Sequence, residues 1–263
     1  HMDWLLYTRL TREIRESGVE ELGLFYLGES MLYKLLPEAI EYAKKDLGFP
    51  YVFLTTNGYR ATADKLRACF EAGLDSLKFS FNAASPAQTV AVTQVDAFDR
   101  QVANIKAARV TRDQTWKETG HRCGLYASSI QYDGEQQARM EQAVTLIRDS
   151  VDEHYWLPLY SQHTLANGEI ERKGFKATQG NPGRVGALRD PLPCWAVFTE
   201  GHVTYDGKLS ACCFSHTDEF TMADLNRVSF IEGWNSTAFQ FLRRAHLVKD
   251  VAGTCCETCV AYA

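Results

Sequence analysis

Residues 48–58 read Gly-Phe-Pro-Tyr-Val-Phe-Leu-Thr-Thr-Asn-Gly, which is a glycine, a short apolar run and a polar tip in that order. Glycine is typical of the end of a helix, because it adopts the left-handed backbone there without steric cost. The apolar run at 51–54 predicts a buried strand, since it is too short for a helix and is bounded by turn residues. The segment therefore predicts the end of a helix, a strand and the loop that follows it.

The same pattern recurs on both sides of this stretch. Helices are predicted at 3–17, 37–47, 62–72, 86–108 and 135–149. Strands are predicted between and after them, at 22–27, 51–54, 77–81, 124–130 and 155–160. Alternating helices and strands indicate parallel βα units with right-handed crossovers, and hence an α/β fold. The pattern alone fits a barrel and a doubly wound sheet equally well.

Composition narrows the class of protein. Hydrophobic residues make up 45% and charged residues 23%, which excludes a disordered or low-complexity chain. The net charge of −5 offers no basic surface for nucleic acid. No stretch approaches the roughly 18 apolar residues of a membrane span, and no secretory signal opens the sequence. We therefore expect a cytoplasmic protein with neither nucleic acid nor membrane as a partner.

Polar residues follow three successive strands. Each residue taken alone fits an ordinary turn, but the carboxyl ends of parallel strands meet at one edge, where ligands bind in such folds. The set therefore predicts one small-molecule site. Its candidate residues are Gly28, Glu29, Thr56, Asn57, Ser80 and Asn82.

Six of the eight cysteines lie in the last 70 residues. Such crowding without a secretory signal favours metal binding or redox chemistry over disulfides. Strands at 196–205 and 208–214, joined by Asp206-Gly207, predict a hairpin that brings Cys194 and Cys212 together. A helix is expected at 232–248, before a terminal Cys-x-x-Cys. The four candidate metal ligands are Cys194, Cys212, Cys256 and Cys259.

Four thiolates can hold zinc or a [4Fe–4S] cluster. The adjacent cysteines Cys213 and Cys255 leave the ligand choice open by one residue at two places. Strand alternation predicts that Cys213 faces away from Cys212. A zinc ribbon usually has two short Cys-x2-Cys motifs, and this sequence has one, which favours iron and sulfur.

These motifs resemble the radical S-adenosylmethionine (SAM) enzymes that carry a C-terminal SPASM or twitch auxiliary-cluster domain. Gly28-Glu29 is similar to the family's GE motif, Thr56-Asn57-Gly58 to a common strand end, and Ser80 to a position that contacts SAM. The spacing Cys194-x12-Gly207-x4-Cys212, followed by Cys256-x2-Cys259, is similar to the SPASM signature. The resemblance covers nearly the whole sequence.

The resemblance implies a partial (β/α)6 TIM-like barrel at 1–162, here lacking its first strand, and linker loops at 163–193. A β-hairpin and helix at 194–263 would hold one auxiliary [4Fe–4S] cluster, as in a twitch domain. The implied activity is that of an oxidoreductase or epimerase that generates a 5′-deoxyadenosyl radical to abstract hydrogen from a substrate. The auxiliary cluster would then handle electron transfer.

One departure from the family concerns its Cys-x3-Cys-x2-Cys motif, which holds a second [4Fe–4S] cluster and is absent from these 263 residues. We expect the sequence to begin just beyond that motif and not to cleave SAM by itself. The alternative is a non-enzymatic or degenerate iron–sulfur protein on a barrel remnant. A zinc-binding structural protein is a third interpretation.

The substrate is expected to be a small carbohydrate-like molecule or a peptide, and the electron donor a reductant such as flavodoxin or ferredoxin. Loops at 110–121 and 163–193 are expected to contact the substrate. Their candidate polar residues are Arg122, His163, Lys173 and Arg184.

Overall fold

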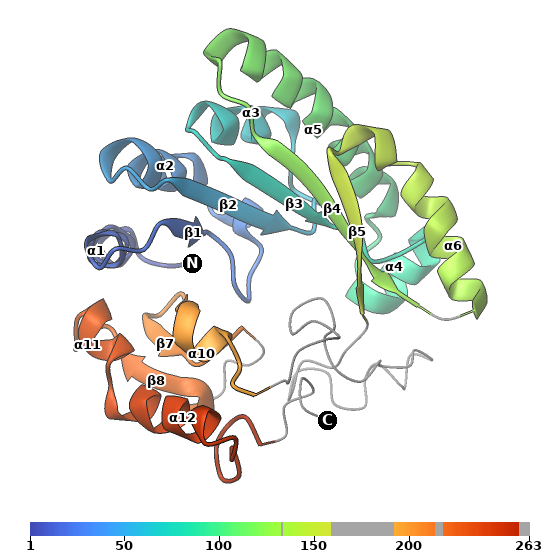
Figure 1. Cartoon of the computed structure of the whole chain (residues 1–263). Helices are drawn as coiled ribbons and strands as arrows, with labels where there is room; N and C mark the ends of the chain where they lie inside the picture. The colour runs from blue at the N-terminus through green and yellow to red at the C-terminus, as the bar shows by residue number, and fades with distance from the viewer. Residues whose placement is uncertain (133, 159–191, 214–217, 258–263) are drawn as a thin grey trace. The chain divides into compact units, whose positions relative to one another are not determined.

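The structure is a computed structural model that describes residues 1–132, 134–158, 192–213 and 218–257 (Figure 1). Its contacts divide the chain into two compact units, which are described separately. One unit is Val19–Leu157, and the other combines His1–Gly18 with Pro158–Ala263. The predicted segment boundaries at 162 and 163 lie outside the described residues, so the division into barrel, linker and cluster domain stays a prediction.

The unit Val19–Leu157 is built on a five-stranded sheet in the order β1-β2-β3-β4-β5. Its strands are β1 (Glu21–Gly23), β2 (Tyr51–Thr56), β3 (Ser76–Ser80), β4 (Gly124–Gln131) and β5 (Glu153–Pro158). The pairings β1–β2, β2–β3 and β3–β4 are parallel. The predicted α/β fold is therefore confirmed. Strands that lie in chain order wind in one direction, as in a barrel, whereas a doubly wound sheet reverses its order at a switch point.

Helices α2 (Leu36–Glu41), α3 (Ala63–Glu71) and α5 (Phe98–Thr119) lie side by side along one face of this sheet (Figure 1). A π-helical turn, Tyr42–Asp46, extends α2, and α6 (Gly134–Thr145) contacts β4. The core between helices and sheet is apolar because both partners turn their apolar faces inward. Its fully buried side chains include Ile40, Val52, Leu66, Leu77 and Phe79.

Two predicted elements of this unit differ from the structure. The strand expected at 22–27 is shorter in the structure, because β1 ends at Gly23. It is the edge strand of the sheet, and its pairing partner is β2. The helix expected at 86–108 is two helices, α4 (Pro86–Thr93) and α5, because Gln94 adopts a left-handed backbone with φ 59°. Helix α5 then continues to Thr119. The loop predicted at 110–121 is therefore wrong for most of its length.

Helix α1 (Trp4–Glu16) belongs to the other unit. The Asp3 carboxylate caps it by accepting hydrogen bonds from the backbone N–H groups of the first turn. Arg9 donates to the Leu225 carbonyl at 2.6 Å, and Glu13 accepts from the Phe230 backbone N–H at 2.8 Å. These bonds join the first helix to a segment more than 200 residues later in the chain.

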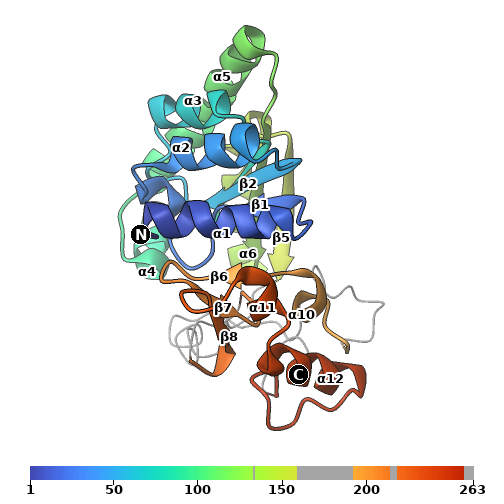
Figure 2. The same cartoon turned by 90° about the vertical axis from the view of Figure 1, so that its left-hand side faces the viewer.

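The same unit holds a three-stranded antiparallel sheet of β6 (His202–Val203), β7 (Lys208–Ser210) and β8 (Thr221–Asp224). Helix α11 (Phe230–Trp234) packs along β8 (Figure 2). The β6–β7 turn has Gly207 at φ +84°, as the predicted Asp-Gly turn requires. The hairpin prediction is thus confirmed at its turn.

Three details predicted for residues 196–248 are wrong. Residues 196–199 form a short helix, α10 (Ala196–Thr199), rather than the start of a strand. Strand β7 ends at Ser210, so Cys212 and Cys213 lie beyond the ladder and strand alternation does not orient them. The helix expected at 232–248 is α11 followed by α12 (Thr237–Leu247), because Ser236 begins a new helix by accepting from the Phe239 N–H.

No helix in the described parts of the chain is both long and apolar enough to cross a membrane.

Candidate functional site

The Glu29 carboxylate links the loop after β1 to the end of β2. Its Oε1 accepts from the Thr56 hydroxyl at 2.6 Å, and its Oε2 accepts from the Asn57 backbone N–H at 2.8 Å. It also accepts from the Met31 N–H at 3.0 Å and so caps a short 3-10 helix, Ser30–Leu32. Because these bonds occupy most of its acceptor sites, Glu29 orients the backbone around Gly28.

The tip of β2 is a tight polar turn. Thr56 Oγ1 accepts from the Gly58 N–H at 3.0 Å, and Asn57 Oδ1 accepts from the Tyr59 N–H at 2.9 Å. Gly58 has φ +77°, and an added Cβ would lie 3.1 Å from the Phe79 ring. Thr56 and Asn57 therefore hold the turn that follows β2. The positive φ favours glycine at 58, and a Cβ there would also crowd the Phe79 ring.

Gln101, on α5, ties the tips of β2 and β3 together. Its Nε2 donates to the Asn57 carbonyl at 2.7 Å and to the Ser80 carbonyl at 2.9 Å, and the residue is only 2% exposed. Its neighbour Asn104 donates to the Gly58 carbonyl at 2.7 Å. Sequence reasoning missed Gln101. The available signal was a polar residue on the helix face that also carries Phe98, Ile105 and Ala108.

The remaining predicted tip residues are placed less tightly. Gly28 is exposed, and an added Cβ there would meet no atom within 4 Å. Ser80 and Asn82 are half-buried, and the Asn82 carbonyl accepts from the Tyr132 hydroxyl at 2.8 Å. The structure thus joins Glu29, Thr56, Asn57 and Ser80 in one hydrogen-bonded frame beside an open glycine.

Three of the C-terminal cysteines share one apolar cluster in the other unit. Cys256 is buried in it, and Cys212 and Cys255 pack against it. The rest of the cluster is formed by Val197, Ala211, Phe220 and Leu242, with Phe198, Met222 and Val251 packed around them. A hydrogen bond with Cys256 lowers the pKa of the Cys255 thiol, which favours the thiolate that binds metal.

Cys194 lies beside α12. Its backbone N–H donates to His246 Nδ1 at 3.2 Å, and burial lowers the pKa of this fully buried histidine. Cys259, the fourth predicted ligand, lies outside the described residues. Within the described residues no three cysteine, histidine or acidic side chains are close enough to hold a metal. Cys212, Cys255 and Cys256 thus share the apolar cluster without forming a metal-binding group among the described residues, and Cys194 lies beside α12.

The two isolated cysteines behave differently. Burial raises the pKa of the Cys69 thiol to about 12 and also raises that of Cys123. Such thiols remain protonated near neutral pH and do not bind metal readily.

Of the predicted substrate contacts, Arg122 forms an ion pair with Asp152 at 2.7 Å. The other three, His163, Lys173 and Arg184, lie outside the described residues.

Comparison with known proteins agrees with the cysteine pattern. Residues 194–260 match the SPASM family, described as an iron-sulfur cluster-binding domain. The match begins at Cys194 and includes all six C-terminal cysteines.

Curated relatives include a probable GTP 3′,8-cyclase of Saccharolobus solfataricus, 36% identical over 108 residues, which are 40% of this chain and 32% of that protein. A protein of the same name from Saccharolobus islandicus is 35% identical over equal shares. The matched region thus spans about a third of the length of these relatives.

Solved structures share the fold at low sequence identity. SuiB of Streptococcus suis bound to S-adenosylmethionine has a TM-score of 0.62 and 14% identity, covering 91% of this chain and 60% of that chain. The protein anSMEcpe with bound AdoMet has a TM-score of 0.60 and 11% identity, covering 93% and 71%. The SPASM match, the sequence relatives and this shared fold together support the resemblance of the chain to radical SAM enzymes that carry a SPASM domain.

Proposed function

We propose that the protein containing this chain is a radical SAM enzyme that abstracts a hydrogen atom from its substrate. The observation that carries the proposal is the hydrogen-bonded frame of Glu29, Thr56, Asn57 and Gln101 at the carboxyl ends of β1, β2 and β3. In folds of this kind, ligands bind at that edge. Reduced cluster and SAM, when bound, supply the 5′-deoxyadenosyl radical for the abstraction.

The described residues fit SAM at this edge. Open space around Gly28 lets a ligand approach the backbone, and the Glu29 carboxylate holds that backbone in place. Ser80, half-buried at the end of β3, offers a hydroxyl for a ribose or carboxylate group. In this proposal Gly28, Ser80 and Asn82 contact SAM, whereas Glu29, Thr56 and Asn57 orient the contacts.

The donor chemistry of the C-terminal unit fits an iron–sulfur cluster. Cys212, Cys255 and Cys256 meet at an apolar cluster, and such surroundings exclude water from a metal centre. We assign Cys194, Cys212, Cys256 and Cys259 as the residues that would hold one auxiliary [4Fe–4S] cluster, and electron transfer is the chemistry that this group would supply when bound. The His246 ring, which accepts from the Cys194 N–H, orients the segment that carries the first ligand.

The substrate class is proposed more broadly. A carbohydrate-like molecule and a peptide are the two candidates from sequence. A nucleotide is a third candidate substrate, because relatives named as GTP 3′,8-cyclases have higher sequence identity to this chain, 36% over 108 residues, than the solved structures have. A flavodoxin or ferredoxin is the proposed reductant, and the cytoplasm the proposed compartment.

The experiment uses the full-length protein, reconstituted anaerobically with iron and sulfide. It is incubated with SAM and dithionite, and 5′-deoxyadenosine is measured by chromatography. Formation of this product supports the proposal. Glu29→Ala should reduce it, whereas Glu21→Ala, an exposed carboxylate on β1, should not. An iron-loaded protein that forms no 5′-deoxyadenosine would instead support the non-enzymatic alternative, and a zinc-loaded protein the structural one.

A further inference from the structure

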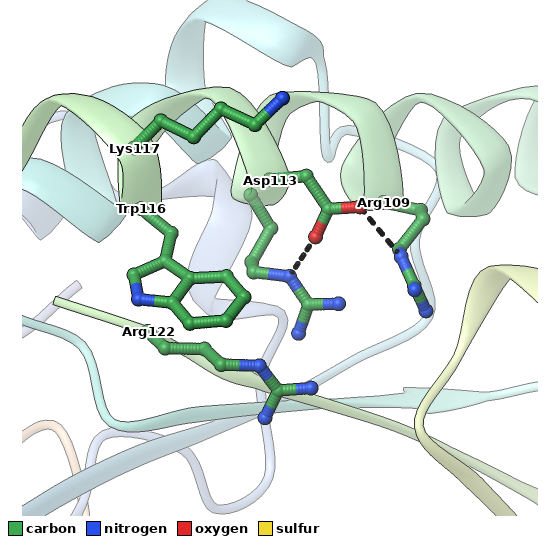
Figure 3. Close-up of a pocket in the computed structure, with 6 residues that line it drawn as sticks. Arg109, Asp113, Trp116, Lys117 and Arg122 are labelled. Atoms are coloured by element: carbon green, nitrogen blue, oxygen red, sulfur yellow. Dashed lines mark hydrogen bonds and ion pairs between the residues drawn. The ribbon is translucent and has the colours of Figure 1, made fainter. Parts of the chain in front are cut away.

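A cationic pocket lies at the opposite end of the sheet from the strand-tip frame. Its volume is about 440 Å³, and we name it the α5 pocket after the helix that supplies most of its lining (Figure 3). The lining residues are Arg109, Arg112, Asp113, Trp116, Lys117 and Arg122. Arg122 precedes β4, so the pocket lies at the amino end of that strand, whereas Gly28 and Asn82 follow the carboxyl ends of theirs.

Ion pairs of the buried Arg112 hold the floor of this pocket in place. Arg112 is 1% exposed and donates to Asp113 at 2.6 Å, to Asp152 at 2.8 Å and to the Cys123 carbonyl at 2.9 Å. Asp113 also accepts from Arg109 at 2.8 Å (Figure 3). These bonds occupy most of the Arg112 donors, so its role is structural. They also neutralise Asp113, which would otherwise repel an anion.

The rim of the pocket carries positive charge and hydrogen-bond donors that its own ion pairs do not use. Four cationic side chains line the pocket as a whole, floor and rim together, and two carboxylates oppose them, Asp113 in the lining and Asp152 beside it. A guanidinium has five N–H donors. Among the described residues, Arg122 uses one of its donors, in the hydrogen bond to Asp152. Lys117 is exposed and forms no ion pair within the described residues. Two positive charges are thus left for a ligand.

Trp116 adds a second kind of contact. Its side chain is 45% exposed, and the Arg122 guanidinium lies 5.4 Å from the ring centroid. Figure 3 shows the indole and Arg122 facing one another below α5. Guanidinium groups bind phosphate through paired hydrogen bonds, and an exposed indole stacks on planar bases. The volume falls within the range of small-molecule sites, roughly 300–1,000 Å³.

We propose that the α5 pocket binds a di- or triphosphate group, either as a free oligophosphate or as part of a nucleotide. Arg122, Lys117 and the outer edge of Arg109 contact the phosphates, and Arg112 with Asp113 and Asp152 fixes the floor. Trp116 stacks on the base where one is present. The site is separate from the strand-tip frame and does not depend on any bound cluster.

The test is isothermal titration calorimetry of the full-length protein with inorganic triphosphate and with ATP and GTP. Lys117→Ala and Arg122→Ala should each weaken binding about tenfold or more, since a charge-assisted hydrogen bond contributes at least that much. Lys106→Ala, which removes an exposed lysine of α5 outside the pocket, is the matched control and should bind as the unchanged protein does. Added SAM should not compete.

The two ligand sources give different results, and both support the site. Equal affinity for triphosphate and nucleotide assigns it to the phosphate group alone. Tighter nucleotide binding that Trp116→Ala abolishes assigns it to a nucleotide. Arg122→Ala also removes the ion pair with Asp152 and could lower the stability of the protein. Lys117→Ala removes no ion pair within the described residues, so its effect on binding decides the test. Absence of binding at millimolar ligand, or unchanged binding in both cationic variants, would overturn the proposal.

Discussion

Glu29 and Thr56 are 27 residues apart in sequence, yet the Thr56 hydroxyl donates to the Glu29 carboxylate at 2.6 Å. With the Asn57 N–H on the second carboxylate oxygen, this bond fixes the loop after β1 against the end of β2. Lys65 on α3 supports the same loop by donating to the Met31 and Tyr33 carbonyls. The exposed Gly28 backbone is therefore held between two anchored segments.

Glu29→Ala should weaken SAM binding and also stability. Three hydrogen bonds to a carboxylate are lost, so we expect the free energy of unfolding to fall by about 2–4 kcal/mol. Calorimetry with SAM and chemical unfolding measure the two effects. Glu21→Ala, on the same strand but exposed, should change neither quantity. Unchanged SAM affinity in Glu29→Ala would refute the role of this carboxylate.

Gln101→Ala should loosen the β2 and β3 tips together. It leaves the half-buried Asn57 and Ser80 carbonyls without their side-chain donor, at a cost of about 1–3 kcal/mol. SAM affinity should fall with stability, because both tips contribute to the site. The control is Gln114→Ala, an exposed glutamine on the same helix. If Gln101→Ala binds SAM with unchanged affinity, the two Gln101 hydrogen bonds are not needed to position the β2 and β3 tips for SAM.

Alanine replacements of Cys194, Cys212, Cys256 and Cys259 should each abolish the absorbance of a reconstituted cluster near 400 nm and destabilise the C-terminal unit, because metal binding there is coupled to folding. Cys213→Ala and Cys255→Ala should retain the cluster. Iron and sulfide analysis measures the result, with Cys69→Ala as a control whose thiol is buried elsewhere.

Comparing Cys255 with Cys256 tests which of these two adjacent cysteines is the ligand. The lowered pKa of Cys255 makes it the competing ligand. Loss of the cluster in Cys255→Ala, with retention in Cys256→Ala, would move the ligand by one residue. A cluster that survives Cys194→Ala would contradict the assignment of the SPASM ligands as a set.

Acid should destabilise the Val19–Leu157 unit through Asp152. Burial raises the pKa of this carboxyl, but hydrogen bonds from Arg112 and the Leu125 N–H outweigh it, so the pKa lies below its ordinary value. A depressed pKa means that the unfolded chain binds more protons, so stability is present above about pH 4 and lost as pH falls. Chemical unfolding at neutral and acid pH measures the loss.

Asp152→Asn should remove part of this pH dependence and cost about 1–3 kcal/mol at neutral pH, because the buried Arg112 would lose one of its two charge partners and keep only Asp113. Asp149→Asn, an exposed acid nearby in sequence, is the control. An equal pH dependence in Asp152→Asn and the unchanged protein would show that other groups govern acid unfolding.

Local periodicity was enough to predict the parallel α/β sheet and the tip residues Glu29, Thr56 and Asn57, because each βα unit carries its own apolar run and glycine. Cysteine order likewise predicted the iron–sulfur domain that the SPASM match supports. These features depend on residues near one another in sequence, or on a motif whose spacing is itself the signal.

Helix boundaries at Gln94 and Ser236, the short β7, and the Gln101 clamp were not predictable in this way. The two helix boundaries depend on one local backbone conformation and one capping bond, which hydrophobic periodicity does not report. The Gln101 bonds join residues 44 and 21 positions apart, and contacts between distant segments leave no periodicity in the sequence. The α5 pocket has the same origin. Arg112 and Asp152 are 40 residues apart, and folding alone makes them partners, because a buried charge requires its counterion nearby.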